Sequence, residues 1–113
     1  MKNPTFQRDI VLIQFPFSDS LQSKVRPVIV MSNDNYNRKF NDFIAVPLTS
    51  NLEQRDHALI ITNKEMESGN LVVDSQVKVD RIYSLEQGQI VKKIGRIKKE
   101  THKNLRDMLL KII

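Results

Sequence analysis

Short apolar runs rich in β-branched and aromatic residues, each bounded by Pro, Gly or polar turn residues, recur along most of the chain. Such runs are typical of β-strands, because branched side chains fit a pleated, half-buried surface. The strands that they predict cover residues 10–15, 24–31, 43–48, 57–61, 71–83 and 90–94. Within the longest run, Asp74 interrupts the alternation of apolar and polar residues and indicates a bulge or bend.

The tail of the chain has a different period. From Lys98 to Ile113, apolar residues recur at the i, i+3, i+4, i+7 spacing of an amphipathic helix with one buried face, namely Leu105, Met108, Leu109 and Ile112. Several strands followed by a closing helix favour a mainly β (α+β) fold. We expect a strongly bent antiparallel sheet or partial barrel with short helices and a C-terminal helix.

The connections between these elements are polar. Residues 18–23 form a link long enough to overhang a site as a mobile loop, or to be an ordinary surface loop. Residues 33–42 read as an Asn-rich connector, and residues 84–88 as a turn. Thr62 and Glu65 have capping-box spacing, which predicts one helical turn that stops at Gly69.

Two aromatic residues lie among the bases of the Asn-rich connector. Tyr36 and Phe40 are placed beside Arg38 and Lys39. Such a group either stacks on unpaired nucleobases or anchors the connector to the core.

Composition limits the class of protein. The 113 residues, 40% of them hydrophobic, suffice for one core, so we expect a single domain over residues 1–113. The sequence has no Cys, which excludes disulfides, thiolate metal sites and a cysteine nucleophile. No apolar stretch has the length of a signal peptide or membrane span, so we expect a soluble, cytoplasmic protein.

The chain is basic, with 18 Lys and Arg against 13 Asp and Glu and a formal net charge of +5. This balance favours a polyanionic partner, above all nucleic acid. The bases crowd the last quarter of the sequence: Lys92, Lys93, Arg96, Lys98, Lys99, Lys103, Arg106 and Lys111. The alternative is a helix whose basic face is simply solvated.

The dipeptide Arg26-Pro27 lies inside the strand predicted over residues 24–31. Pro27 cannot donate a ladder hydrogen bond, so it belongs near the start of a strand or on an edge. Arg26 therefore sits where a loop enters the sheet. There it either presents a planar fork of donors to a phosphate or carboxylate, or is a rim residue with its head in water.

Several kinds of catalysis lack their residues. The two histidines, His57 and His102, have no metal-ligand spacing, the three glycines form no phosphate-binding loop, and no Gly-x-Ser-x-Gly motif occurs. Metal-free phosphoryl chemistry on RNA remains, because RNA supplies its own 2′-hydroxyl nucleophile. Arg26 and Thr49 can position the phosphate and stabilise its charge.

At these residues the chain resembles the MazF/PemK-like toxins of type II toxin–antitoxin modules. The matching motifs cover residues 9–19, 24–33 and 44–50, with a weaker match at 69–71, 74–77 and 94–97. The resemblance implies an SH3-like barrel, a homodimer, and an mRNA interferase that cleaves single-stranded RNA at short sequences without a metal or cofactor. Its products carry a 2′,3′-cyclic phosphate and a 5′-hydroxyl, and the cleavage inhibits translation and growth.

The resemblance also assigns roles to residues. Arg26 and Thr49 match the catalytic arginine and threonine, and Ser50 is a supporting residue. The RNA-binding candidates are Ser18, Asp19, Ser20, Lys24, His57, Ser75 and Gln76. His57 is alternatively a base near neutral pH. The expected partner is an antitoxin whose acidic tail follows the basic groove.

One position departs from the family pattern, and two other functions remain open. Arg8 stands where the family usually has Gly, which affects the local turn and adds a charge near the expected site. The same fold also suits a binding toxin, such as a topoisomerase poison, or a degenerate RNA-binding module. The third hypothesis is a basic structural domain associated with the ribosome.

Overall fold

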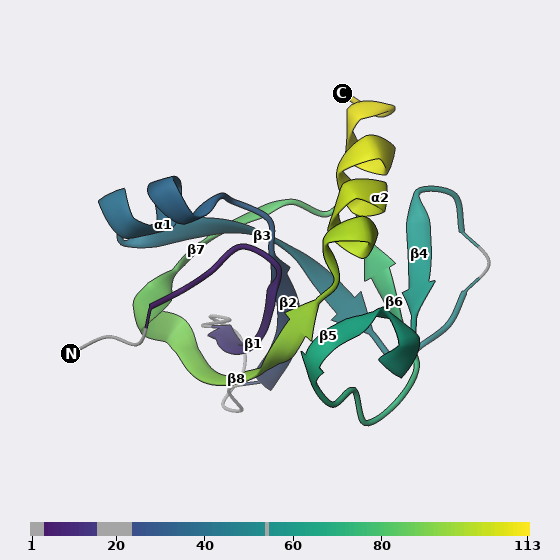
Figure 1. The fold of residues 1–113 in the computed structure, drawn as a ribbon, viewed down its shortest axis with the longest axis horizontal. Coiled ribbons are helices and arrows are strands. Elements are labelled where there is room, and N and C mark those ends of the chain that lie inside the picture. The colour runs from purple at the N-terminus through teal and green to yellow at the C-terminus, as the bar shows by residue number, and fades with distance from the viewer. Residues whose placement is uncertain (1–3, 16–23, 54) are drawn as a thin grey trace.

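A computed structural model describes residues 4–15, 24–53 and 55–113. Its strands are β1 (Asp9–Phe15), β2 (Lys24–Val30), β3 (Asp42–Thr49), β4 (Ala58–Ile61), β5 (Met66–Gly69), β6 (Ser75–Lys78), β7 (Tyr83–Glu86) and β8 (Ile90–Ile97). Its helices are α1 (Asp34–Lys39) and α2 (Lys99–Leu110), with short 3₁₀ turns at η1 (Asn63–Glu65) and η2 (Gln87–Gln89). Figure 1 shows the strands curling around one another below α2.

The strands form one antiparallel sheet in the order β4-β6-β3-β2-β1-β8-β5, with β7 also paired to β3. The pairing of β1 with β8 shifts register twice, and such irregularities increase the local bend of a sheet. The result is a mainly β half-barrel with short helices and a C-terminal helix. The predicted fold class is confirmed.

Strands β1, β2 and β3 are buried on both faces, which explains their nearly continuous apolar sequence. In β2, Ile29 belongs to one core cluster, while Val28 and Val30 belong to the other. The same alternation separates Val46 from Ala45 in β3. Successive side chains along each strand point to opposite faces of the sheet and thus fill two cores, one on each side.

Helix α2 covers one of these two cores. Leu105 is fully buried in it, and Met108 and Leu109 pack against it. The predicted helical face is confirmed for these three residues. Ile112 falls outside α2, which ends at Leu110, so the fourth apolar position of the pattern lies beyond the helix.

The prediction of a connector over residues 33–42 was wrong, because this segment contains α1. Asn33 caps the helix, since its side chain accepts a hydrogen bond from the backbone N–H of Tyr36 at 2.8 Å. The Tyr36 and Phe40 rings pack on each other with centroids 4.8 Å apart. The helix has only six residues and a polar surface, so its sequence carries no helical apolar period.

The single long strand over residues 71–83 and the turn over 84–88 were also wrong. Strand β6 is confined to residues 75–78, and a turn at 79–80 separates it from β7 at 83–86. The backbone N–H of Arg81 donates to the Lys78 carbonyl at 3.2 Å and closes this turn. The change of direction lets β6 and β7 pair with different parts of β3, a long-range arrangement that local alternation does not encode.

The capping box at Thr62 is confirmed, but the helical turn ends at Glu65 rather than Gly69. Residues 66–69 form β5, which pairs with β8 at a very close approach. A Cβ on Gly95 would lie 2.4 Å from the Ser68 carbonyl oxygen, and Gly69 has a φ of +77°. Gly95 therefore permits β8 to continue to residue 97 beside β5, where a strand end was predicted.

Candidate active site

Arg26 and Thr49 lie on the same face of the sheet because of strand register. Val28 pairs with Pro47, and continuing that antiparallel register sets Arg26 opposite Thr49. Arg26 shares the parity of Val28, whose side chain is fully buried in the core cluster on that face. The strand thus carries its side chains from the core out to the rim, where the Arg26 guanidinium is exposed.

The sheet opens at this rim. The pairing of β2 with β3 covers residues 28–30, while the end of β3 pairs with β6 instead, at Leu48 and Thr49. Pro27 lies just beyond the β2–β3 pairing, so its missing N–H leaves no bond of that ladder unmade. A pocket of about 220 Å³ occupies the opening, lined by Arg26, Pro47, Leu48, Thr49, Lys78, Arg81 and Tyr83.

The hydroxyl of Thr49 is oriented by the backbone. Its Oγ1 accepts a hydrogen bond from the N–H of Asn51 at 3.2 Å. A hydroxyl that accepts from the protein keeps its own proton available for another acceptor. Thr49 can therefore donate to an oxygen bound in the pocket beside Arg26.

Three of the lining residues were not predicted from the sequence. Lys78 ends β6, Arg81 follows the turn and Tyr83 begins β7 opposite Ala45 of β3. They converge on the pocket because the chain turns between β6 and β7. The basic and aromatic residues at positions 78–83 could have indicated a nucleic-acid contact. The segment was instead predicted as one continuous strand, which did not include the turn that brings these residues together.

The only carboxylate inside this turn is already paired. Asp80 forms a salt bridge with Arg55, and this hydrogen bond from the guanidinium lowers the pKa of the Asp80 carboxyl group. Arg55 is thus the main partner of the Asp80 carboxylate, and the charge of Arg81 contributes less to the lowered pKa. The pocket keeps a cationic character suited to a phosphate.

The other described RNA-binding candidates lie outside the pocket lining. Gln76 is buried and binds the backbone of Glu53 with both ends of its amide, at 2.7 and 3.0 Å. Ser75 is buried and donates to the Val73 carbonyl. These two residues hold neighbouring loops in place.

Two other candidates are exposed residues near the pocket. Ser50 directly follows Thr49 at the end of β3. His57 has a φ of +58° and accepts at its carbonyl from the N–H of Val79 at 3.3 Å, next to Lys78. Neither residue lines the pocket.

The remaining candidates cannot be placed. Ser18, Asp19 and Ser20 lie outside the described residues, as does the whole predicted loop over 18–23. The backbone of Lys24 begins β2, but its side chain is outside the described part of the structure. Within the described ranges no group of His, Cys, Asp or Glu has metal-binding geometry.

Arg8 does not lie among the residues lining this pocket, so the expectation that it adds a charge near the site was wrong. It precedes β1 with a φ of +80°, the conformation for which Gly is favoured. The Arg8 guanidinium donates to the Ile97 carbonyl and to Glu67, at 2.9 and 3.0 Å. These contacts hold the residue in its unfavourable backbone region at the other end of the sheet.

The fold matches solved toxin structures along nearly its full length. MazF in a MazE–MazF structure from Deinococcus radiodurans aligns with a TM-score of 0.81 at 17% identity, over 97% of this chain and 96% of that one. An endoribonuclease in complex with its cognate antitoxin, from a mycobacterial species, aligns at 0.77 and 18%, over 95% and 92%. The MazF-mt6 toxin of Mycobacterium tuberculosis aligns at 0.72 and 16%, over 90% and 92%. The chain thus has the half-barrel fold of MazF toxins.

The family follows from the sequence itself. The model of the PemK-like, MazF-like toxin of type II toxin–antitoxin systems matches residues 6–113. The chain belongs to this PemK/MazF-like toxin family, as its motifs predicted. A search of curated proteins gave no match. Among the described residues, no helix is long and apolar enough to cross a membrane.

Proposed function

We propose that this protein is the endoribonuclease toxin of a toxin–antitoxin module, an mRNA interferase that cleaves single-stranded RNA without metal and so inhibits translation and growth. The observation that carries the proposal is the meeting of Arg26 and Thr49 at one open pocket with Lys78 and Arg81. Membership of the toxin family and the endoribonucleases among its structural neighbours support the same reaction.

The reaction is an in-line displacement at one phosphodiester. The 2′-oxygen forms a bond to phosphorus and gives its proton to solvent water, while the bond from phosphorus to the 5′-oxygen breaks and that oxygen gains a proton. The products are a 2′,3′-cyclic phosphate and a 5′-hydroxyl. Arg26 stabilises the negative charge that grows on the nonbridging oxygens, and the Thr49 hydroxyl donates to one of them.

No imidazole or carboxylate is among the described residues that line the pocket. Arg26 is therefore the residue best placed to protonate the leaving 5′-oxygen, although a guanidinium is a poor base for the 2′-hydroxyl. Most of the rate enhancement then comes from positioning and charge stabilisation. Lys78 and Arg81 hold neighbouring phosphates, and Tyr83 offers an aromatic ring on which a base can stack.

Binding partners follow the same proposal. Single-stranded RNA is the substrate, an antitoxin with an acidic tail is the inhibitor, and the protein is a cytoplasmic homodimer with one toxin domain over residues 1–113. The solved relatives in complex with MazE or a cognate antitoxin support the inhibitor. Strand β4 lies at one edge of the sheet with Ile60 exposed, which supports pairing with a second copy.

The test is incubation of the purified protein with a long single-stranded RNA in EDTA, followed by analysis of the fragment ends. Arg26→Ala removes the charge, and Thr49→Val removes only the hydroxyl while keeping the shape of the side chain. Each variant should lower the cleavage rate roughly a hundredfold to a thousandfold, as loss of an oxyanion donor does. Arg38→Ala, at an exposed position on α1 away from the pocket, is the matched control.

Cleavage by the wild type that leaves cyclic phosphate ends, and that both site variants lose, would support the nuclease. Uncut RNA across several substrates would overturn it and favour a binding toxin, such as a topoisomerase poison. Equal cleavage by wild type and both variants would instead point to a contaminating nuclease. Circular dichroism of each variant establishes that the fold is retained.

A further inference from the structure

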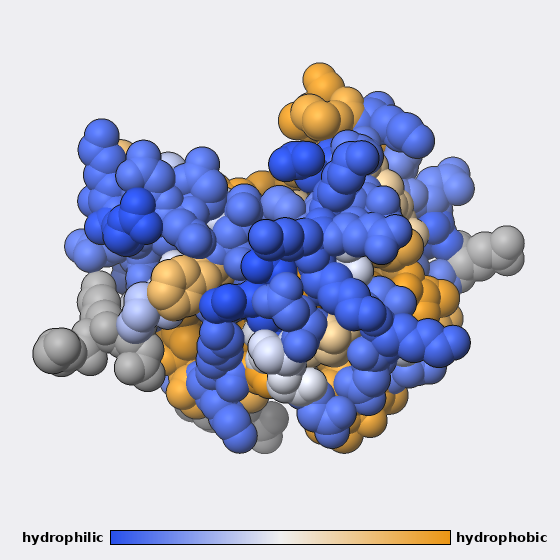
Figure 2. Space-filling view, viewed as in Figure 1, coloured by the Kyte–Doolittle hydropathy of each residue, from blue (hydrophilic) through white to orange (hydrophobic). Residues whose placement is uncertain are grey.

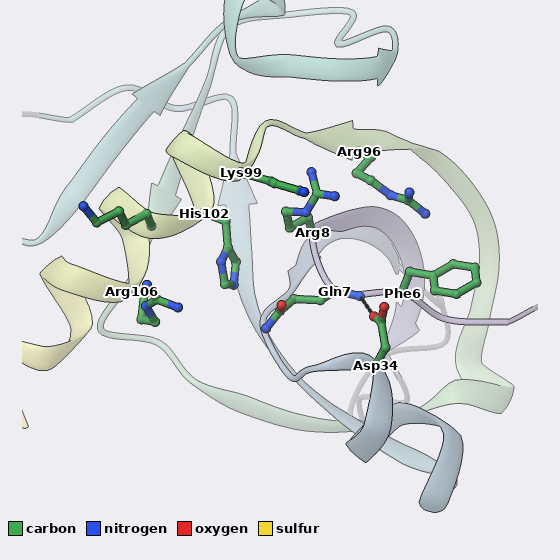
Figure 3. Close-up of a pocket in the computed structure, with 9 residues that line it drawn as sticks. Phe6, Gln7, Arg8, Asp34, Arg96, Lys99, His102 and Arg106 are labelled. Atoms are coloured by element: carbon green, nitrogen blue, oxygen red, sulfur yellow. Dashed lines mark hydrogen bonds between the residues drawn. The ribbon is translucent and has the colours of Figure 1, made fainter.

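A second, larger pocket lies at the opposite end of the sheet, between the start of β1, the end of β8 and α2 (Figure 3). Its volume is about 570 Å³. The lining residues are mostly basic: Phe6, Gln7, Arg8, Asp34, Arg96, Lys99, His102, Lys103 and Arg106. Figure 2 shows that the face between α1 and α2 is largely hydrophilic.

Two of the bases already have carboxylate partners. Arg8 is paired with Glu67, and Arg96 with the buried Asp9, each at 3.0 Å. Among the described residues, the other three bases, Lys99, Lys103 and Arg106, form no ion pair. Asp34 is the single carboxylate among the lining residues, and Asp9 is shared between Arg96 and Lys93, so positive charge is in excess around the pocket.

His102 gives the pocket a buried nitrogen atom, Nε2, that has no hydrogen-bond partner among the described residues. The side chain extends from α2 toward Gln7 and Arg8, and the residue is only 6% exposed (Figure 3). It bonds to the backbone of Met31, while its Nε2 has no hydrogen-bond partner among the described residues. A buried polar atom without a partner costs free energy, so such an atom in a pocket indicates a ligand.

We propose that this pocket binds a phosphate dianion, either free or at the end of a nucleotide chain, with His102 Nε2 as one donor and Lys99, Lys103 and Arg106 as its counter-charges. A phosphate monoester carries close to two negative charges at neutral pH and three acceptor oxygens. A dianion therefore suits the excess of positive charge in the pocket. The guanidinium of Arg106 adds a planar fork of donors suited to phosphate.

Binding is coupled to protonation of His102. Burial lowers its pKa, and the charges of Arg106 and Arg8 lower it further, while the hydrogen bond to the Met31 backbone opposes this shift. The charged residues that line the pocket together with this ring are Lys99, Lys103 and Arg106 of α2, Arg96 of β8, Arg8 just before β1, and Asp34 of α1. A bound dianion offsets these positive charges, so the ring takes up a proton and its Nε2 becomes a donor.

The site is separate from the proposed catalytic pocket. Arg26 lies near the start of β2, whereas the Met31 backbone that His102 contacts follows its end. None of the residues lining one pocket lines the other. A ligand here need not contact the scissile phosphate, and an acidic peptide is less suited because each carboxylate carries one charge.

The test uses calorimetry on the full-length protein with three probes: inorganic phosphate, a 5′-phosphorylated deoxydinucleotide, and the same dinucleotide with a 5′-hydroxyl. Deoxynucleotides lack the 2′-hydroxyl, so cleavage activity does not affect the result. We expect binding of the phosphorylated probe and about tenfold weaker binding by Lys103→Gln/Arg106→Gln. The matched variant Lys92→Gln/Lys111→Gln loses the same charge outside the pocket and should bind like the wild type.

A second readout follows His102 itself. Its imidazole resonances are titrated by NMR in sulfate, a dianion without a proton of its own in this range, and in chloride at equal ionic strength. His57→Gln identifies the signal, because the chain has only two histidines. The pKa of His102 should be higher in sulfate, and the Lys103→Gln/Arg106→Gln variant should lose that rise.

Each outcome decides the proposal. Equal pKa values of His102 in the two salts would overturn the proposal. Equal weakening of probe binding by both double variants would also overturn it, because it would show a general attraction of anions to the basic protein. Tighter binding of a poly-glutamate peptide than of any phosphate probe would assign the pocket to an acidic protein segment instead. Binding of inorganic phosphate without preference for the dinucleotide identifies a free phosphate, whereas the reverse preference identifies a nucleotide end.

Discussion

The two basic pockets of this protein are built in different ways. The Arg26 pocket lies at the rim of paired strands, where register alone sets Arg26 opposite Thr49. The His102 pocket joins three segments distant in sequence, and α2 must be docked before it exists. A site made by strand register is robust to changes in side-chain packing, whereas one completed by a docked helix depends on that packing.

Their titratable groups also differ. Among described residues the Arg26 pocket is lined by Arg, Lys and Tyr without an imidazole, while the other pocket encloses a buried histidine. The first arrangement suits stabilisation of charge over a wide pH range. The second makes ligand binding depend on a proton.

The sharpest separation of the two pockets comes from paired variants. Arg26→Ala should lower RNA cleavage roughly a hundredfold to a thousandfold and leave affinity for the phosphorylated deoxydinucleotide unchanged. Lys103→Gln/Arg106→Gln should weaken binding of the phosphorylated deoxydinucleotide about tenfold and leave RNA cleavage unchanged. Cleavage rates and calorimetry on the same preparations measure both effects, and parallel losses in both assays would mean that the pockets form one continuous site.

Loosening α2 should distinguish the pockets through stability. Leu105→Ala removes a fully buried side chain and should lower the free energy of unfolding by about 3 kcal/mol. In the remaining folded protein, phosphate affinity should fall more than RNA cleavage. Leu110→Ala, on the same helix but 61% exposed, is the control and should change stability by less than about 0.5 kcal/mol in urea denaturation.

Lys78 at the end of β6 and Arg81 after the turn should contribute mainly charge. Lys78→Gln/Arg81→Gln should weaken binding of uncleavable single-stranded nucleic acid about equally for different sequences. The slope of log affinity against log salt should fall in magnitude by roughly 0.7 for each phosphate that the variant no longer neutralises. Affinities measured by fluorescence anisotropy over a range of salt provide the slope, and a loss confined to one sequence would instead indicate base recognition.

The buried histidine predicts how stability changes with pH. Because folding lowers the pKa of His102, the unfolded chain binds a proton first, so the contribution of this residue is complete above about pH 6.5 and declines as pH falls toward its native pKa. Urea denaturation between pH 5 and 8 tests this. His102→Gln should reduce the slope, and sulfate should reduce the loss in the wild type.

The smallest effect is expected at the partly exposed ion pair beside the Arg26 pocket. Arg55→Gln should lower stability by less than about 1 kcal/mol, because such pairs are screened by solvent. It also frees the charge of Asp80 next to Lys78 and Arg81, so RNA binding should weaken slightly. Asp80→Asn/Arg55→Gln restores the balance of charge and should recover the binding.

Much of the candidate active site could be predicted because its two central residues sit in local patterns. The run Val28-Ile29-Val30 indicates a strand buried on both faces, and Arg26-Pro27 marks where that strand meets its rim. Thr49 likewise follows the apolar run of β3. The resemblance to the toxin family then connected two motifs whose spatial pairing the separate runs do not specify.

Lys78, Arg81 and Tyr83 were missed for the opposite reason. Their segment alternates like one strand, but pairing with two parts of β3 forces a turn at residues 79–80. Strand β5 was missed because its partner β8 lies far along the chain and accepts it only through the close approach at Gly95.

The sequence by itself determined the mainly β class and the apolar face of α2, since these follow from residue types and periodicity within single segments. Only the tertiary structure decided which cations meet. Arg8, expected to add a charge near the active site, instead lines the second pocket with Arg106, because contacts between distant segments depend on how the strands pair and where the helix docks. Local periodicity carries no information about such distances.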